Sequence, residues 1–554
     1  MKKLIFILGV LPYFLYSQNK VPSGLIKDEK KAISEQVNVF MNDCYERGLF
    51  NGCVLVSKND EIVYEKALGY ADIFNKTQLS TESSFDIGSI AKSFTAMCIM
   101  ILEEQDKLYY DDKLSSFFPE FPDYADKITI HHLLCHQSGI LDYNNDLAML
   151  SGELNNDIIL KRLLEEELIF ETGTRSRYSN SGYFLLARII EKVSGLSYGE
   201  FVDQNIFKPL GMKNSVVFDS ENKKIERKTV GRNFTIPDDK IQIITGDGGI
   251  YTTVDDLYKW HLSLCNPVII SQKSMDRATT PSLLSDGIQT QEGYGWHITY
   301  KDNEKIISHG GASPSGYISY IVQPASCEYS IILLTNFFLS ENFGIVLNGL
   351  KAIVDETTPN ELRTPVMYKL NKHIMDHGVN DLDFVYKKYN SDTLKYTAFE
   401  ELEFIQLSSF YKNRKYYEDA IAILNIYKEE FTNSVIPLEE LAEIYKLINE
   451  KELFDDVENE RRNLAAKLSN EGSIEIQLKN PKTEDYEMSL NVRKGPGSVY
   501  EIISVIKPGE SYVVIGRSLN GEWLKLKRNG WLYNRTGRVS KEQLKTLSFI
   551  RFND

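Results

Sequence analysis

The sequence is poor in cysteine, and the few cysteines that it has form no recognisable framework. Six of them are scattered between Cys44 and Cys327, and no two are spaced as Cys-x-x-Cys. This spacing argues against a cysteine-ligated metal site and against a small fold held together by disulfides. We expect most of the six to be buried thiols, and only Cys44 and Cys53 are close enough in sequence to suggest a disulfide.

Long apolar runs are also missing. No stretch reaches the length of about 18 apolar residues that a membrane-spanning helix needs. The run from Leu4 to Leu15 follows two lysines and is followed by Tyr16-Ser17-Gln18. This order of charged, apolar and small residues predicts a signal peptide over residues 1–17, and therefore an exported protein, periplasmic or secreted. No cysteine follows the run closely, so a lipid anchor is not expected.

Basic residues are outnumbered, and the net charge of the chain is −15. An acidic body argues against nucleic acid as the main partner. Residues 481–554 hold 13 Lys and Arg against 8 Asp and Glu, so this end carries +5 and the remainder −20. A basic end is suited to contact an anionic polymer, although most charge runs only face solvent.

The apolar pattern divides the rest of the chain into three regions. In residues 28–355, β-rich runs at both ends flank a long stretch of helical periodicity. This order predicts an α/β (α+β) domain with one antiparallel sheet built from both ends and a helical subdomain packed against it. Residues 356–470 are helical in pattern. One helix–turn–helix unit there resembles a tetratricopeptide repeat, but a plain helical spacer explains the pattern equally well.

Residues 485–550 return to short β-rich runs. Leu490 to Pro496 reads Leu-Asn-Val-Arg-Lys-Gly-Pro, and Gly530-Trp531 follows near the end. In these residues the sequence resembles bacterial SH3-like domains. The resemblance implies a small all-β barrel and, because such modules often accompany wall enzymes, peptidoglycan as a partner.

Ser89 and Lys92 suggest a nucleophile and its base. Acyl transfer needs a nucleophile, a nearby base and donors that face the oxyanion. Ser and Lys three residues apart at a helix start share one face. The same pattern also occurs at Ser17, Ser220, Ser409 and Ser504. Only Ser89 follows a strand-like entry with a glycine and precedes a helix that is apolar on most sides, where a lysine is costly unless it is paired.

Three further stretches support this interpretation. Leu133 to Ile140 reads Leu-Leu-Cys-His-Gln-Ser-Gly-Ile, Gly246 to Thr253 reads Gly-Asp-Gly-Gly-Ile-Tyr-Thr-Thr, and Gly293 to Trp296 reads Gly-Tyr-Gly-Trp. With Ser89 and Lys92, they resemble class C β-lactamases and their relatives among D,D-peptidases and esterases, over roughly residues 48–350. The resemblance implies an acyl-enzyme hydrolase that needs no metal or organic cofactor.

The family's second element, Tyr-x-Asn, is matched at Tyr178 and Asn180. The segment Tyr143 to Asn145 also fits, but only Tyr178 precedes an amphipathic helix as in the family. By resemblance, Tyr178 relays protons to and from the nucleophile and the leaving group, and Asn180 holds Lys92 and the substrate amide. A tyrosine with an ordinary pKa of about 10 needs a nearby cation to act as a base at neutral pH. The sequence leaves open whether Lys92 or Tyr178 takes the first proton.

The third element departs from the family's usual Lys-Thr-Gly. It reads His309-Gly310-Gly311, a variation that peptidase and esterase members share. The histidine replaces a permanent cation, which weakens the binding of a substrate carboxylate. Family geometry implies an oxyanion hole made by the backbone N–H groups of Ser89 and of Ala312, just past Gly311.

These observations lead to the hypothesis of an exported D,D-peptidase or carboxypeptidase-type hydrolase linked to the cell wall. The alternatives are an esterase or β-lactamase that acts on small acyl compounds, and a vestigial binding or sensory protein, against which the intact motifs argue. His131, His132 and His136 have a spacing that suggests a metal site. They match the family's Leu-Leu-x-His segment, and no His-Glu-x-x-His is present, so we expect no metal.

Overall fold

The structure is a computed structural model that describes residues 23–471, except 74, 144–155, 219–224, 232–243, 314, 337–339, 398 and 400, together with strands between residues 474 and 533. The predicted signal peptide, residues 1–17, lies outside the described residues. No described helix combines the length and the hydrophobicity that crossing a bilayer requires.

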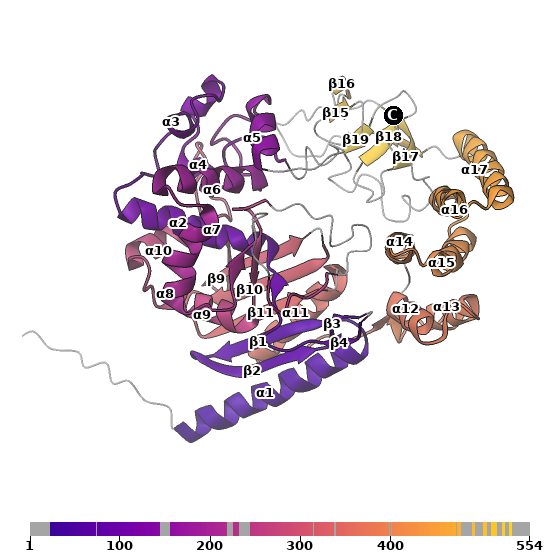
Figure 1. The fold of residues 1–554 in the computed structure, drawn as a ribbon, viewed down its shortest axis with the longest axis horizontal. Coiled ribbons are helices and arrows are strands. Elements are labelled where there is room, and N and C mark those ends of the chain that lie inside the picture. The colour runs from indigo at the N-terminus through magenta and orange to yellow at the C-terminus, as the bar shows by residue number, and fades with distance from the viewer. Residues whose placement is uncertain are drawn as a thin grey trace, which may run out of the picture.

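A six-stranded antiparallel sheet forms the centre of the first part of the chain, as predicted (Figure 1). Two of its strands come from the beginning of this part and four from its end, and the two groups meet where β1 pairs with β11. In spatial order the strands are β2 (Glu61–Leu68), β1 (Gly52–Lys58), β11 (Tyr329–Thr335), β10 (Tyr317–Pro324), β9 (Glu304–Ser313) and β8 (His297–Lys301).

Alternating side chains of the central strands enter two different cores. Val54 and Val56 pack with α1 (Ser23–Glu46) and α11 (Ser340–Val354) on one face of the sheet. Cys53 and Leu55 face the helical subdomain on the other. This alternation follows from the two-residue period of a strand. Because both faces are covered, the central strands are buried along their whole length.

The helical subdomain lies between β2 and β8 in the sequence. Its helices are α2 (Ala91–Glu104), α3 (Leu114–Phe117), α4 (Ile130–Leu134), α5 (Asn156–Leu164), α6 (Asn180–Ser194), α7 (Tyr198–Val202), α8 (Lys208–Leu210), α9 (Val254–Cys265) and α10 (Gln272–Ala278), with single turns η1 (Gly88–Ile90), η2 (Asp123–Asp126) and η3 (Asp203–Phe207). Short strands β3 (Tyr70–Asp72), β4 (Thr77–Gln78), β5 (Phe85–Asp86), β6 (Val216–Val217) and β7 (Ile250–Thr252) connect it to the sheet. The helix α2 is buried on most sides, as its composition predicts.

One disulfide joins Cys265, at the end of α9, to Cys327, in the turn between β10 and β11. The sequence reasoning had no reason to pair these two, because 62 residues separate them and only the packing of α9 against the sheet brings them together. Cys44 and Cys53, the pair that the sequence suggested, are instead free buried thiols. Burial raises the pKa of Cys44 to about 12, so this thiol is unreactive.

The next region is helical, as its pattern indicates. It begins with β12 (Thr364–Pro365), which pairs with β13 (Tyr396–Thr397), and its helices are α12 (Val366–His377), α13 (Leu382–Asn390), α14 (Glu401–Asn413), α15 (Tyr417–Glu430), α16 (Ile436–Leu447) and α17 (Lys451–Glu471). They share a core of their own and follow one another in a row (Figure 1). The likeness to tetratricopeptide repeats stays a prediction.

The helical region meets the sheet domain at α12. The ring of Tyr368, on α12, lies against Gly48, where an added Cβ would be 2.1 Å from the ring. Gly48 also has a positive φ of 72°, which L-residues rarely adopt. Glycine is therefore required there for two independent reasons.

The last described strands pair into a second six-stranded antiparallel sheet. They are, in spatial order, β14 (Ile474–Gln477), β17 (Ser511–Arg517), β18 (Trp523–Leu526), β19 (Trp531–Tyr533), β15 (Leu490–Arg493) and β16 (Ile502–Ile506). Among these described strands no pairing joins β16 to β14, and no closed barrel is detected in this part of the chain. The likeness to SH3-like domains stays a prediction.

Candidate active site

Ser89 lies in η1, between the short strand β5 and the long buried helix α2. Two glycines allow the backbone that precedes Ser89 to lie directly against β9. An added Cβ on Gly88 would lie 2.7 Å from the Ala312 carbonyl oxygen, and one on Gly311 would lie 1.9 Å from the Ile87 carbonyl oxygen. The Ser319 hydroxyl, on β10, donates to the same Ile87 oxygen at 2.7 Å. The nucleophile candidate is thus fixed against the edge of the sheet.

Lys92 follows one turn later and is completely buried. Its Nζ lies 3.0 Å from Ser89 Oγ, 2.8 Å from Asn180 Oδ1 and 2.8 Å from the Asp247 carbonyl oxygen. The last two partners can only accept hydrogen bonds, so two of the N–H groups of Lys92 must point at them. The third position on the nitrogen faces Ser89.

Tyr178 lies on the open side of this group and is 38% exposed. The Lys92 Nζ lies 4.9 Å from the centre of its ring, and His136 packs on the ring with the two centres 4.5 Å apart. His136 Nδ1 accepts the Ser179 N–H at 3.0 Å, which fixes the backbone between Tyr178 and Asn180. The structure therefore brings the predicted tyrosine next to the predicted lysine.

Asn180 begins α6, where Ser179 caps the helix by accepting the Gly182 N–H. This start explains why Tyr-x-Asn precedes an amphipathic helix. The cap holds the first turn of α6 against Lys92, and the Asn180 side chain is buried there.

His309 lies on β9, and its ring is 6.2 Å from that of Tyr178, centre to centre. Burial and the positive charge of Lys92 lower the pKa of His309 to about 3, so the ring is neutral at physiological pH. Its Nδ1 lies 2.7 Å from the Gly310 carbonyl oxygen and must donate to it. The neutral ring then carries its lone pair on Nε2, so His309 offers an acceptor where the family usually has a cation.

Gly311 and Ala312 continue β9 past His309. The contacts of Gly88 and Gly311 place this strand segment beside Ser89, and Ala312 is exposed on the strand. The assignment of the Ser89 and Ala312 N–H groups as an oxyanion hole stays a prediction.

Sequence reasoning missed a layer of acids behind this group. Asp142 accepts the Asn180 N–H at 2.5 Å and the Asn180 Nδ2 at 3.3 Å, and the Tyr143 hydroxyl donates to Asp247 Oδ2 at 2.5 Å. Burial raises the pKa of Asp247, although Lys92 opposes the effect. The signal in the sequence was the position of Asp142, two residues after the segment 133–140 that carries the family resemblance. Tyr143, the rival match to Tyr-x-Asn, belongs to this layer.

The neighbouring histidines have structural partners. His131 Nδ1 lies 2.8 Å from the Tyr294 hydroxyl, and His132 completes the cap of α4 with Thr129. Both rings are therefore engaged by neighbouring side chains of the described structure.

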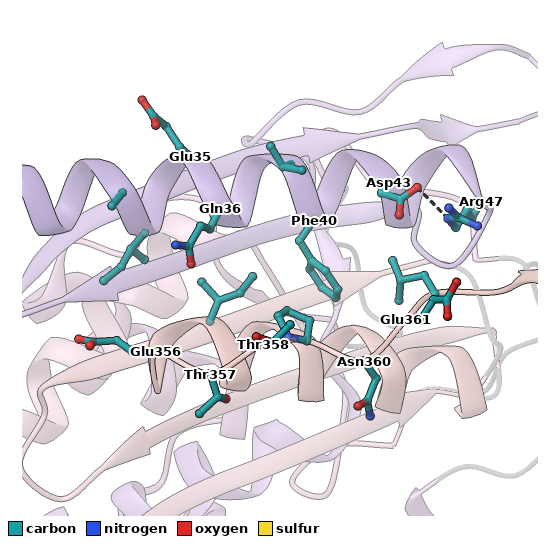
Figure 2. A pocket seen from close by; sticks show the side chains of 16 residues that line it. Glu35, Gln36, Phe40, Asp43, Arg47, Glu356, Thr357, Thr358, Asn360 and Glu361 are labelled. Carbon is teal, nitrogen blue, oxygen red and sulfur yellow. Dashed lines mark hydrogen bonds and ion pairs between the residues drawn. The ribbon is translucent and has the colours of Figure 1, made fainter.

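A groove of about 920 Å³ lies elsewhere, between α1 and the segment that follows α11 (Figure 2). Phe40 and Leu362 contribute to its apolar lining, while Glu35, Glu356 and Glu361 lie around it. It is on the α1 side of the sheet, whereas Ser89 lies on the side of the helical subdomain. The groove is therefore separate from the candidate active site.

Buried neutral histidines should make the fold sensitive to acid. The pKa of His309 is about 3 and that of His132 about 4, and burial also places the pKa of His136 well below 6.5. Because the unfolded state binds protons first, the stability that these groups contribute is complete above about pH 6.5 and is lost as the pH falls toward the folded-state values. For His309 the loss between pH 7 and pH 5 is on the order of 2 kcal/mol, which corresponds to a few degrees in Tm.

Thermal unfolding at pH 7 and pH 5 tests this expectation. The His309→Gln variant should show a smaller fall in Tm over this interval than the wild type. The matched control is His377→Gln, at an exposed position on α12, which should leave the fall unchanged. An equal fall in all three proteins would contradict the role of His309.

Comparison with known proteins gives four relevant matches. A sequence model of the beta-lactamase family matches residues 34–356. Penicillin-binding protein 4* of Bacillus subtilis is 33% identical over 317 residues, which cover 52% of this chain and 69% of that protein. A D-aminopeptidase of Brucella anthropi is 28% identical over 273 residues, 47% of this chain and 51% of that protein. The solved octameric penicillin-binding protein homologue from Pyrococcus abyssi has a TM-score of 0.51 and 28% identity, and covers 59% of this chain and 78% of its own.

Proposed function

We propose that this chain, which belongs to the beta-lactamase family over residues 34–356, cleaves amide bonds next to D-amino acids. Its relatives in that family are serine hydrolases. The observation that carries the proposal is the contact of Ser89 Oγ with Lys92 Nζ at 3.0 Å, beside Tyr178. The substrate class is suggested by relatives that are named penicillin-binding protein and D-aminopeptidase. A D,D-peptidase is one member of this class.

The arrangement around Lys92 supports an acyl-enzyme mechanism. A neutral lysine amine has two N–H groups and one lone pair. Asn180 Oδ1 and the Asp247 carbonyl oxygen take the two N–H groups, so the lone pair of a neutral Lys92 is directed at Ser89 Oγ. In the charged form the third N–H takes that place. A neutral Lys92 can therefore accept the Ser89 proton directly, while a charged Lys92 leaves that step to Tyr178.

The steps then follow with their protons accounted for. Ser89 Oγ attacks the acyl carbon and gives its proton to Lys92 or Tyr178. The tetrahedral intermediate expels the amine, which takes a proton from Tyr178, and if Lys92 had accepted the serine proton it passes that proton on to Tyr178. Water then attacks the acyl-enzyme and gives a proton to the base that had accepted the serine proton. When the second tetrahedral intermediate collapses, this proton returns to Ser89 Oγ and the acid is released. Backbone N–H donors on β9 are suited to stabilise the oxyanion during both acylation and deacylation.

His309 narrows the range of substrates. A neutral ring with an acceptor at Nε2 repels a carboxylate oxygen and favours a group that donates a hydrogen bond. This argues for amides and peptides that have no free carboxylate at that position, rather than for a carboxypeptidase. It also supports the second candidate function, an esterase that acts on small acyl compounds.

A substrate panel tests the proposal. We expect turnover of D-alanine p-nitroanilide to exceed that of the L-enantiomer by at least about tenfold, a difference of only 1.4 kcal/mol in transition-state binding. The panel includes an acyl-D-Ala-D-Ala peptide, p-nitrophenyl acetate and a chromogenic cephalosporin. Hydrolysis of the ester alone, with neither enantiomer of the anilide cleaved, would favour the esterase.

The proposal extends to the place of action. The predicted signal peptide supports export, and the charge of +5 on residues 481–554 supports contact with an anionic wall polymer. We expect a chain that ends after residue 470 to keep its turnover of soluble substrates but to lose retention on sedimented peptidoglycan. Equal retention of the full and the shortened chain would exclude the terminal region as a wall anchor.

A further inference from the structure

The side-chain amide of Asn180 has two different ends, and within the described residues each end hydrogen-bonds to one side chain. Its Oδ1 accepts from Lys92 Nζ at 2.8 Å, and its Nδ2 donates to Asp142 Oδ1 at 3.3 Å. The other Asp142 oxygen accepts the Asn180 backbone N–H at 2.5 Å. Both Asp142 and Asn180 are buried, Asp142 to 99%. Both carboxylate oxygens of Asp142 thus accept hydrogen bonds from Asn180, so Asp142 presents the amide with an acceptor.

The direction of this amide decides where the lone pair of Lys92 points. In the observed orientation Asn180 takes an N–H from Lys92, and the lone pair of a neutral amine remains for Ser89. If the amide were reversed, its NH₂ group would face the lysine nitrogen and compete with Ser89 for the lone pair. A charged Lys92 would meet another donor, which is unfavourable in a buried site. Only one of the two orientations supports proton transfer from Ser89.

The neighbouring segment is held so that Asp142 cannot easily turn away. The Ser181 hydroxyl donates to the Leu141 carbonyl oxygen at 2.7 Å, and the Tyr143 N–H donates to Ser181 Oγ at 2.9 Å. Residues 141–143 are thus bound to the first turn of α6 on both sides of Asp142. The carboxylate faces Asn180 in a fixed position.

We propose that Asp142 is a positioning residue that keeps the Asn180 amide oriented with Oδ1 toward Lys92, and thereby directs the proton acceptor at Ser89. The inference deepens the proposed function, since it rests on acylation of Ser89. It does not require Asp142 to touch the substrate. None of the hydrogen bonds among the described residues uses the second N–H of Asn180 Nδ2, which can therefore donate to the carbonyl oxygen of a bound acyl group.

The substitution Asp142→Asn changes the chemistry with almost no change in shape. An asparagine at 142 has one acceptor and one donor end, while the backbone N–H and the Nδ2 of Asn180 both require acceptors. If the oxygen of the new asparagine accepts the Asn180 backbone N–H, its NH₂ group faces the NH₂ group of Asn180. This contact between two donors is relieved only if the Asn180 amide reverses. We expect the acylation rate of Ser89 by p-nitrophenyl acetate, measured as the burst of nitrophenolate, to fall about 10- to 100-fold, below the full effect of losing an acid–base group.

A double-mutant cycle separates this role from a structural one. Asn180→Ala removes the amide whose direction is at issue, so Asp142→Asn should then have less than about a threefold further effect. If Asp142 only stabilises the start of α6, its effect on the rate should be the same in both backgrounds. The inference would be overturned if the rate losses of Asp142→Asn and Asn180→Ala multiplied in the double variant. An unchanged rate in Asp142→Asn would overturn it as well. Circular dichroism at the assay temperature establishes that each variant is folded.

Two further variants complete the test. A serine at position 142 can accept the Asn180 backbone N–H but cannot also accept from Asn180 Nδ2. Asp142→Ser should therefore lower the acylation rate to a similar extent. It replaces Asp142→Asn if that variant does not fold. Asp256→Asn is the matched control. Asp256 is completely buried and accepts the Asn214 N–H at 2.7 Å, but it contacts none of Ser89, Lys92 or Asn180 in the hydrogen bonds of the described chain. Its rate should stay within about twofold of the wild type.

The outcome for the wild type distinguishes the two proposals. If the wild type shows no burst with the ester and no turnover of any amide in the panel, the proposed function is wrong, and the inference falls with it. If the wild type acylates normally and the cycle shows independent effects, only the role of Asp142 is wrong.

Discussion

Replacing Ser89 with alanine should abolish covalent labelling of the protein and lower turnover by about 10⁴- to 10⁶-fold, the range seen when a serine nucleophile is removed. The reason is that no other hydroxyl lies against Lys92 Nζ in the hydrogen bonds of the described residues. Intact mass spectrometry after reaction with an acyl-forming probe should show one adduct on the wild type and none on Ser89→Ala.

Ser93 provides the matched control for this experiment. It lies in α2, about one turn after Ser89, is buried, and its hydroxyl donates to the Ile90 carbonyl oxygen at 2.8 Å. Ser93→Ala should keep the adduct and most of the turnover. An adduct that persists in Ser89→Ala would show that the nucleophile is another residue.

Lys92→Met and Tyr178→Phe should each lower kcat by about 10²- to 10⁴-fold, which is the usual contribution of a positioned acid or base. Methionine fills the buried volume of the lysine stem without its nitrogen, so the fold should be retained. Because the Lys92 Nζ lies 4.9 Å from the Tyr178 ring and both residues are proposed to handle the Ser89 proton, the double variant should lose much less than the product of the single losses. The measurement is kcat for each variant on the best substrate of the panel.

Thermal stability provides the control for the lysine–tyrosine pair. Tyr178 is partly exposed, so Tyr178→Phe should change Tm by little. A large fall in Tm together with a small fall in kcat would show that Tyr178 is structural. Losses that multiply in the double variant would show that the two residues act independently.

The main elements of the candidate site could be predicted because each carries a local signal. Ser89 and Lys92 share one turn at the start of an apolar helix, and Tyr178 and Asn180 flank the cap of α6. The two-residue alternation of strands and the long helical pattern likewise indicated the sheet and its helical cover. From the sequence it could be predicted that His309 takes the place of a lysine, so that the pocket has one permanent cation fewer. The tautomer of that ring depends on the Gly310 carbonyl, which only the folded strand places beside it.

The acids behind the site could not be predicted, because their roles arise only when distant segments meet. Asp142 lies 38 residues from Asn180, and Tyr143 lies 104 residues from Asp247. An isolated aspartate or tyrosine carries no mark of its partner. The disulfide between Cys265 and Cys327 was missed for the same reason, since no periodicity in the sequence encodes the contact between α9 and the end of β10.

The pairing of β1 with β11 has a consequence for how the chain reaches its native state. Ser57 and Ser330 share a hydrogen bond at 2.7 Å across this pair, although 273 residues separate them. The central strands of the sheet therefore cannot assemble until nearly the whole of this part has been synthesised, and closing so long a loop slows folding. During that delay β1 can pair with its neighbour β2, but the side of β1 that receives β11 stays open. A chain with this topology therefore keeps a strand edge unpaired for longer than one built from local hairpins alone.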